Sequence, residues 1–197
     1  DTQLPGVAHR VVHGGTAFTG PTRVTASVVE ALAALAPLAP LHQPHNLLAI
    51  RQLLEARPDL PQVACFDTAF HAGHERLVAE YAEPEKLTVA GIRRYGFHGL
   101  SYDWIARRLQ EQAPQLYAGR VVVAHLGNGS SLCALKGGRS IDTTMGMTAT
   151  EGLPMGTRSG SIDPGAIFFM QRSLGMSVNE VEKTLNSESG LKGMAGL

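Results

Sequence analysis

Apolar residues recur along the chain in two alternating patterns. Short, nearly continuous apolar runs that lead into turns predict buried strands over residues 7–12, 62–66, 121–126 and 132–135. Helical spacing or helix-starting residues predict helices over residues 22–36, 45–57, 76–81, 101–112, 164–172 and 178–186. Since strands alternate with helices and hairpins, we expect an α/β fold with mixed sheets flanked by helices.

Capping residues set the expected ends of several helices. Ser101 is a candidate N-cap for the helix that follows it, and Pro164 fits the first turn of another. Ser177 and Glu180 have the spacing of a capping box. Residues 190–197 lack a strong pattern and are expected to be frayed.

Composition excludes some classes of function. The 17 basic and 17 acidic side chains cancel, so nothing favours binding to nucleic acid or to an anionic membrane. The longest uncharged run, residues 31–50, holds three prolines and is not a membrane helix. Cys65 and Cys133 lie in apolar runs, which favours buried thiols in a reducing compartment. These features predict a soluble, cytoplasmic protein.

A glycine-rich turn joins the predicted strands at 121–126 and 132–135. Gly127 and Gly129 would let the backbone adopt positive φ and approach a ligand closely, and Asn128 adds hydrogen-bonding groups. Such a turn can cradle a phosphate with main-chain N–H groups. An Asn-Gly pair is also common in ordinary hairpin turns, so both interpretations stay open at this point.

Charged residues follow two of the predicted strands. Arg10 lies at the end of the first strand, beside a flexible turn, and arginine suits bidentate contact with a carboxylate or phosphate. Asp67 follows the strand at 62–66, where ligands bind in open α/β sheets, and could hold Mg²⁺ or orient an attacking oxygen. A surface arginine and a helix-capping aspartate are the alternatives.

The histidines are candidates both for metal ligands and for hydrogen-bond donors to phosphate. Three pairs have spacings that could chelate a metal: His9/His13, His42/His45 and His71/His74. The sequence has no HExxH motif and no close pair of cysteines, which disfavours a zinc site. Neutral His98 and His125 could instead donate to phosphate oxygens.

Arg158 stands in a glycine-flanked loop, as Arg10 does. Two arginines, two histidines, a carboxylate and a glycine turn would form a phosphoryl-transfer site if they converged. No GxxxxGK[ST] pattern is present, so the chain is not a P-loop kinase. A hydrolase that uses Ser130 or Ser131 with His125 is disfavoured, because the sequence lacks a G-x-S-x-G nucleophile elbow.

Five segments resemble, in order and roughly in spacing, the motifs of the acetokinase family: His9–Gly15, Cys65–His71, Arg94–Gly99, His125–Ser131 and Met155–Gly160. The family belongs to the actin-like ATPase superfamily, which has a ribonuclease H-like architecture. The resemblance implies two related α/β domains around a cleft, with residues 1–69 part of the N-terminal domain and residues 70–197 part of the C-terminal domain. It also implies direct in-line phosphoryl transfer from ATP to acetate, giving ADP and acetyl phosphate, with Mg²⁺ as cofactor and a homodimer at full length.

The resemblance also implies roles for five side chains. Arg10 would hold the acetate carboxylate or the transferring phosphoryl group. Asp67 would be the essential carboxylate near Mg²⁺ and the acceptor oxygen, as an indirect or partial metal ligand. His98 and Arg158 would stabilise the transition state, and His42 would line the site.

Two further groups follow from the same resemblance. The ATP-phosphate loop would consist of His125, Leu126, Gly127, Asn128 and Gly129. The acetate methyl group would lie against Val12, Leu41, Phe97 and Ala149. Ala149 stands where the family usually has a proline, which would widen this small apolar pocket and lead to tolerance of propionate or other short-chain acids, since a pocket discriminates one methylene by only about 1–3 kcal/mol.

Several motifs of the family have no counterpart in the sequence. The family's first strand with its own phosphate loop, its adenosine-binding motifs and a glutamate that would assist Asp67 with Mg²⁺ are not found. The chain is therefore expected to be a fragment covering roughly the middle half of such a protein. A nucleotide-binding piece without turnover is the alternative for the isolated chain.

Overall fold

The computed structural model describes residues 4–40 and 42–196. The strands are β1 (Val7–Val11), β2 (Thr22–Arg23), β3 (Gln62–Phe66), β4 (Arg120–Leu126), β5 (Ser130–Lys136) and β6 (Arg139–Thr143). The helices are α1 (Ala26–Ala33), η1 (Ala36–Leu38), α2 (Gln43–Ala56), η2 (Ala69–His71), α3 (Arg76–Ala79), α4 (Glu85–Val89), α5 (Gly99–Gln112), α6 (Pro114–Tyr117), α7 (Pro164–Arg172), α8 (Val178–Lys183), η3 (Thr184–Glu188) and α9 (Gly190–Ala195).

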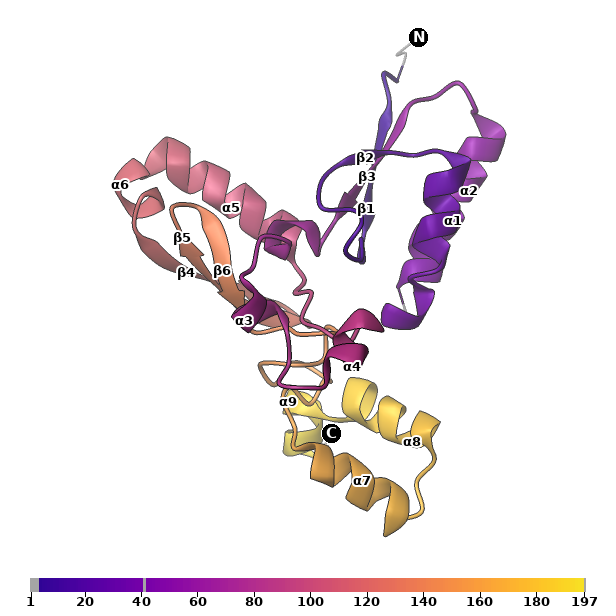
Figure 1. The fold of residues 1–197 in the computed structure, drawn as a ribbon, viewed down its shortest axis with the longest axis vertical. Coiled ribbons are helices and arrows are strands. Elements are labelled where there is room, and N and C mark those ends of the chain that lie inside the picture. The colour runs from indigo at the N-terminus through magenta and orange to yellow at the C-terminus, as the bar shows by residue number, and fades with distance from the viewer. Residues whose placement is uncertain (1–3, 41, 197) are drawn as a thin grey trace.

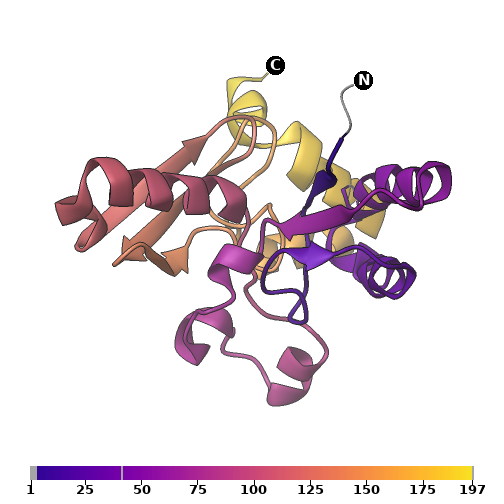
Figure 2. The ribbon, with the colours of Figure 1, turned by 90° about the horizontal axis from the view of Figure 1, so that it is seen from above.

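These elements form three lobes around a central region of loops and short helices (Figure 1). The first lobe, residues 7–66, holds β1 to β3 with α1 and α2. The second lobe, residues 99–143, holds α5, α6 and β4 to β6. The third lobe, residues 164–195, holds α7, α8, η3 and α9. Figure 2 shows the same separation from above. The α/β class with mixed sheets and helices is confirmed, and the domain boundary at residue 69 stays a prediction.

The sheet of the first lobe has the order β1-β3-β2. β1 and β3 are parallel, with Arg10 beside Cys65 and Val11 beside Phe66, while β2 is antiparallel to β3. Helices α1 and α2 pack against it and complete an apolar core: Val11, Val24, Val29, Leu32, Leu47, Ile50, Ala64 and Phe66. The parallel pairing brings the carboxyl ends of β1 and β3 to one edge, so the residues that follow each strand meet there.

The sheet of the second lobe is an antiparallel meander, β4-β5-β6. Helix α5 covers one face, where Tyr102 and Ala106 pack on Cys133 and Leu135. Side chains of β4 alternate between half-buried and exposed, as expected for a strand with one face covered. Gly137 and Gly138 both have positive φ in the tight turn between β5 and β6.

The third lobe is attached through main-chain hydrogen bonds. Ser159 N donates to Leu185 O and Ser189 N donates to Thr157 O. The capping box of Ser177 and Glu180 at the start of α8 is confirmed. No helix within the described residues is both long and apolar enough to span a membrane.

Three local predictions were wrong, and two elements were missed. Residues 22–36 form β2 and then α1, because Thr25 caps the helix only from residue 26. Ser101 is not an N-cap, since α5 begins at Gly99 and the Ser101 hydroxyl bonds His125 instead. Residues 190–195 are helical rather than frayed. Strand β6 and helix α4 were not predicted as elements.

A buried polar network joins η2 to the second lobe. His71 Nε2 lies 3.0 Å from the carbonyl oxygen of Phe97, and its Nδ1 lies 2.8 Å from Ser140 Oγ. Because a carbonyl only accepts, Nε2 of His71 carries the proton and Nδ1 accepts from the serine hydroxyl. Ser140 Oγ then accepts from His74, at 2.7 Å, and from the Cys133 thiol, at 3.3 Å. The network fixes the loop that carries Phe97 into the centre of the molecule.

Acidification is expected to destabilise this network. Burial lowers the pKa of His71 from 6.5 to about 4, so between these values the unfolded chain binds a proton that the folded chain does not. The stability that His71 contributes is therefore full above pH 6.5 and is lost as the pH falls towards 4. The loss from this residue is up to about 3 kcal/mol, at about 1.4 kcal/mol per pKa unit. Urea unfolding across this range measures it.

The control for this prediction is a set of variants. His71→Gln is expected to be less stable at neutral pH but to lose less on acidification. In His71→Gln the free energy of unfolding still falls with pH, though less steeply, because burial also lowers the pKa of His13 and of His98 to about 4. His45→Gln, which removes an exposed histidine from α2, is expected to keep the full slope. A slope in His71→Gln as steep as that of the parent chain would contradict the assignment.

Candidate active site

Arg10 and Asp67 form a bidentate ion pair at the carboxyl ends of strands β1 and β3. Arg10 Nε donates to Asp67 Oδ1 at 3.0 Å, and Nη2 donates to Oδ2 at 2.6 Å. The aspartate is 2% exposed, whereas the arginine side chain is 63% exposed. The hydrogen bond to Asp67 raises the pKa of Arg10 above its usual range. The guanidinium is thus oriented by a buried carboxylate while its outer edge stays open to a ligand.

The main chain around Asp67 is tied to both neighbouring segments. Asp67 N donates to Val11 O at 3.1 Å, which extends the pairing of β1 with β3 by one residue. Asp67 O accepts from Gly99 N at 2.9 Å, at the first residue of α5. The aspartate therefore lies where the first lobe meets the start of α5.

His98 occupies a strained position directly before α5. It is the only non-glycine residue with positive φ among those the structure describes, at φ 60°. Its ring stacks on that of His125, with centroids 4.0 Å apart and 22° between the planes. Burial, followed by the nearby charges of His125, Arg10 and Arg158, lowers the pKa of His98 to about 4. The imidazole is neutral at physiological pH and can donate a single N–H.

Gly129 lies where His98 and Arg158 come together. A Cβ placed on this glycine would be 3.2 Å from Arg158 Nη1 and 3.5 Å from His98 Nε2. Neither Gly127 nor Gly129 has positive φ, so that part of the sequence prediction was wrong. Gly129 instead leaves space beside two hydrogen-bond donors. The turn is also tied to the Arg158 loop, because Gly156 N donates to Asn128 O at 3.1 Å.

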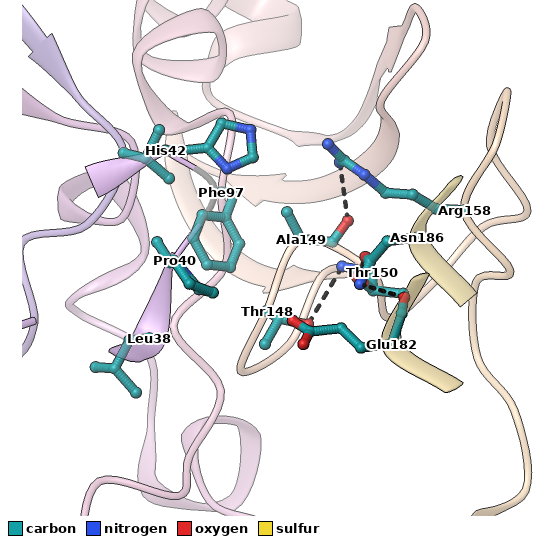
Figure 3. A pocket seen from close by; sticks show the side chains of 12 residues that line it. Leu38, Pro40, His42, Phe97, Thr148, Ala149, Thr150, Arg158, Glu182 and Asn186 are labelled. Carbon is teal, nitrogen blue, oxygen red and sulfur yellow. Dashed lines mark hydrogen bonds between the residues drawn. The ribbon is translucent and has the colours of Figure 1, made fainter. Parts of the chain in front are cut away.

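A pocket of about 90 Å³ opens beside these residues (Figure 3). Its lining residues come from distant parts of the chain: Val12, Leu38, Ala39, Pro40, His42, Phe97, Thr148, Ala149, Thr150, Arg158, Glu182 and Asn186. Leu38, Pro40 and His42 lie on one side, and Arg158, Glu182 and Asn186 lie on the other. The pocket thus has an apolar wall and a cation, a combination that suits a small carboxylate.

Charge and burial set the character of the pocket. Arg158 is held by a hydrogen bond from Nη1 to the carbonyl oxygen of Ala149 at 3.1 Å, and burial lowers its pKa. Burial also lowers the pKa of His42, with smaller contributions from Arg158 and Arg10. One cation, Arg158, and one histidine with a lowered pKa, His42, therefore line the cavity, which attracts an anion and leaves the imidazole N–H as a neutral donor.

The structure brings part of the predicted site together. Val12, His42, Phe97, Ala149 and Arg158 line one pocket. The apolar side chains of Val12 and Phe97 belong to a buried cluster with Ala39, Met145 and Met155, and Ala149 packs against it. Leu41 lies outside the described residues. The function of each residue stays a prediction, because geometry alone does not assign it.

Sequence reasoning missed two parts of the pocket wall. Residues 38–40 were not predicted to belong to the site, although their proline-rich, apolar composition could have indicated a rigid wall beside Val12. Glu182 and Asn186 carry no recognisable motif. Asn186 is placed by its own contacts, since its Oδ1 accepts a hydrogen bond from Thr150 Oγ1 at 2.5 Å.

The metal and hydrolase alternatives receive no support. In the part of the chain that the structure describes, no three His, Cys, Asp or Glu side chains are placed to hold a metal ion. Ser130 Oγ donates to Gly127 O, Ser131 Oγ bonds His98, and the His125 ring bonds Ser101. Neither candidate nucleophile is thus paired with His125.

Comparisons with known proteins agree with this arrangement. The family model described as the acetokinase family matches residues 1–197. The acetate kinase of Nitrobacter hamburgensis is 54% identical over 191 residues, which cover 97% of this chain and 47% of that protein. The acetate kinase of Rhodopseudomonas palustris is 53% identical over 196 residues, which cover 99% of this chain and 49% of that protein. The chain spans about half the length of the curated relatives it matches.

Solved structures give the same result. A propionate kinase from Francisella tularensis superposes with a TM-score of 0.91 at 46% identity, over 96% of this chain and 50% of that one. The acetate kinase of Entamoeba histolytica superposes with a TM-score of 0.89 at 34% identity, over 98% and 50%. The sequence and the fold therefore point to the same group of proteins.

Proposed function

Because the chain belongs to the acetokinase family, we propose that it supplies the acyl-binding and phosphoryl-transfer part of a short-chain carboxylate kinase. The reaction is the reversible, ATP-dependent phosphorylation of acetate to acetyl phosphate. The observation that carries the proposal is that Arg158 lines a small pocket with an apolar wall and meets His98 beside Gly129. The ion pair of Arg10 and Asp67 lies close enough for its charges to act on His42 in the pocket wall.

In this proposal the carboxylate enters with its methyl group in the pocket. Val12, Phe97 and Ala149 surround the methyl group, and the open edge of Arg10 binds the carboxylate. One carboxylate oxygen attacks the terminal phosphorus of ATP in line. The bond from that phosphorus to the bridging oxygen breaks, and ADP leaves with the electron pair. The chemistry depends mainly on positioning and on neutralising charge.

Two donors would stabilise the transferring group. Arg158 supplies a fixed positive charge, and neutral His98 supplies an N–H. Both approach the open space beside Gly129, where a phosphoryl oxygen could lie. Donors of this kind contribute most where charge develops in a partly dehydrated site. His42, on the opposite wall, would contact the same group from the side of the first lobe.

The nucleotide would lie along the turn that follows β4. We assign the ATP phosphates to His125, Leu126, Gly127, Asn128 and Gly129. Mg²⁺ would arrive with the nucleotide as part of the substrate. Asp67 would contribute at most one carboxylate towards it, since that side chain also holds Arg10. The homodimer implied by the family and the cytoplasmic location predicted from the composition are also part of this proposal, and sedimentation of the protein tests the former.

The proposal is tested by acyl hydroxamate formation from acetate and ATP. Two forms are compared: this chain, and a form extended to the length of its relatives, called here the extended protein. Turnover by the extended protein supports the kinase assignment, and its absence with every short carboxylate contradicts it. ATP binding by this chain without turnover would support the second candidate, a nucleotide-binding piece that needs the rest of the protein.

The preferred acid is expected to include propionate. Ala149 is half-buried at the apolar wall, and a proline ring there would narrow the pocket. In the extended protein, Ala149→Pro is expected to lower the ratio of propionate to acetate kcat/KM by about 5- to 100-fold, corresponding to about 1–3 kcal/mol. The substitution breaks no main-chain hydrogen bond within residues 4–40 and 42–196, since Ala149 N donates none there.

Ala149→Gly is the matched control for this prediction. It does not narrow the pocket and is expected to keep or raise the propionate ratio. Hydroxamate assays with acetate, propionate and butyrate measure all three forms. Equal ratios in the parent and Ala149→Pro would show that position 149 does not set acyl length.

A further inference from the structure

Two buried hydroxyl groups connect helix α5 to the ring of His98. Ser131 Oγ lies 2.9 Å from His98 Nδ1 and is hydrogen-bonded on its other side to the Tyr102 hydroxyl. Tyr102 and Ser131 are each 0% exposed. Within the described residues, these are the only side chains that either hydroxyl bonds, and the main-chain contact of the Tyr102 hydroxyl is with the N–H of His125, which can only donate. The three groups therefore have to satisfy one another.

The number of available hydrogen atoms and acceptors fixes the direction of the hydrogen bonds from Tyr102 through Ser131 to His98. A buried O–H group that finds no acceptor costs about 1–3 kcal/mol. Tyr102 has only Ser131 to donate to, so its hydrogen points at Ser131 Oγ. The hydrogen of Ser131 then has only His98 Nδ1 as an acceptor. If Nδ1 carried a proton instead, one of the two hydroxyl hydrogens would be left buried without a partner.

We propose that Tyr102 and Ser131 are positioning residues that hold His98 as the tautomer with its proton on Nε2. Nδ1 is then the acceptor of the Ser131 hydroxyl, and Nε2–H is the free donor. The direction of the chain follows from the hydrogen bonds alone. The use of that N–H on a phosphoryl or carboxylate oxygen rests on the proposed function.

The free nitrogen of His98 faces the candidate site. His98 Nε2 and Arg158 Nη1 lie 3.5 and 3.2 Å from the same point, the Cβ position at Gly129. Stacking on His125 holds the plane of the ring, and the positive φ of His98 holds its backbone. An acceptor in this space meets two donors only if the histidine proton is on Nε2. With the proton on Nδ1, a bare nitrogen would face the anion.

Burial keeps Tyr102 protonated and His98 neutral, as these hydrogen bonds require. It raises the pKa of Tyr102 to about 12, so the phenol keeps its hydrogen. The lowered pKa of His98 keeps the ring neutral, with one proton to be placed on either nitrogen. The placement of that proton is therefore set by hydrogen bonding and not by pH in the neutral range.

Nitrogen NMR of the ¹⁵N-labelled chain tests the assignment directly. Long-range proton–nitrogen correlation spectra distinguish a protonated ring nitrogen from an unprotonated one, and His98→Gln identifies the signals. Near neutral pH we expect Nδ1 of His98 to be unprotonated and Nε2 to be protonated. A protonated Nδ1 in the parent chain would overturn the proposal, and this measurement requires no variant to fold.

Variants then test the source of the preference. Tyr102→Phe and Ser131→Ala are expected to raise the share of His98 protonated on Nδ1, whereas Ser131→Thr retains the hydroxyl and is expected to restore the parent spectrum. Thr143→Val is the control, because it removes a buried hydroxyl that donates to Leu132 O on the same sheet and has no bond to His98. Unchanged His98 signals in both Tyr102→Phe and Ser131→Ala would contradict the proposal.

Activity separates this inference from the proposed function. In the extended protein, Ser131→Ala is expected to lower kcat by about tenfold with little change in KM, because the donor acts mainly on the transition state. Ser131→Thr is expected to recover most of the rate. If the spectra of the parent chain show the expected tautomer but the extended protein has no turnover, the hydrogen bonds from Tyr102 through Ser131 to His98 are supported and the kinase assignment is wrong. A Ser131→Ala variant with unchanged kcat would overturn the catalytic use of the tautomer.

Discussion

Replacing Asp67 by alanine is expected to lower the kcat/KM of the extended protein by about 10³-fold or more, since the loss of one pre-oriented charged group from a transition-state site costs on this order. Asp67 fixes Arg10 through two hydrogen bonds, at 3.0 and 2.6 Å. Without the carboxylate, the guanidinium loses the only partner that orients it within the described residues. Hydroxamate formation measures the effect.

The fold is expected to survive this substitution. The Arg10 side chain is 63% exposed, so water can solvate its charge when the aspartate is lost. Because the buried aspartate is the group removed and the arginine that remains is solvated, the cost to stability is expected to be about 1–3 kcal/mol, the range for hydrogen bonds to charged groups. Urea unfolding of the same samples separates lost activity from lost structure.

Two further variants sharpen the Asp67 experiment. Asp67→Asn keeps the shape but loses the charge, and is expected to be nearly as impaired as Asp67→Ala. Asp103→Asn removes an exposed carboxylate that pairs with Arg107 on α5, and is expected to leave the rate unchanged. Activity of Asp67→Ala within tenfold of the parent would contradict the role given to this carboxylate.

Gly99→Ala is expected to destabilise the chain by about 3 kcal/mol or more, at the upper end of the cost of overpacking. A Cβ at this position would overlap the carbonyl oxygen of Asp67 and lie 2.8 Å from Phe70 Cβ. The Asp67 carbonyl is main chain and accepts a hydrogen bond from Gly99 N, so it cannot move aside without loosening the start of α5. Urea unfolding near neutral pH measures the loss.

Gly73→Ala provides the matched control. Nothing lies within 4 Å of a Cβ at Gly73, and its φ is not positive. This substitution is expected to change stability by no more than about 0.5 kcal/mol. If Gly99→Ala proved as stable as Gly73→Ala, the tight contact between α5 and the Asp67 turn would be wrong.

The meeting of Arg10 and Asp67 was predictable, because it depends on local rules. Apolar runs at 7–12 and 62–66 indicate buried strands, and parallel strands present their carboxyl ends at one edge. The observed register places Val11 beside Phe66, so the side chains near both strand ends become neighbours. Strand β3 has the predicted bounds for the same reason.

The start of α5 was not predictable from capping rules. A serine before an apolar helical pattern is typical of an N-cap, yet the Ser101 hydroxyl forms a hydrogen bond with His125 of strand β4. The helix can begin at Gly99 because His98 adopts positive φ and glycine fits against Asp67. Both conditions are tertiary contacts, which no local pattern contains.

The role of Gly129 shows a similar limit. A sequence does not distinguish a glycine needed for positive φ from one needed for space, because both appear as the same letter. Here the space beside Arg158 and His98 is what a side chain would remove. The opposite wall of the pocket could not be predicted either, because Asn186 is placed there by the packing of the third lobe and belongs to no recognisable motif.

The walls of the pocket belong to different lobes. Val12 and Leu38 come from the first lobe, whereas Glu182 and Asn186 come from the third. A small carboxylate that contacts both sides therefore acts as a reversible cross-link between parts of the chain that share few other contacts. By linkage, a ligand that binds only when the walls are together stabilises their closed arrangement. Under the proposed function, the bound carboxylate would itself help to make the lobes one cooperative unit.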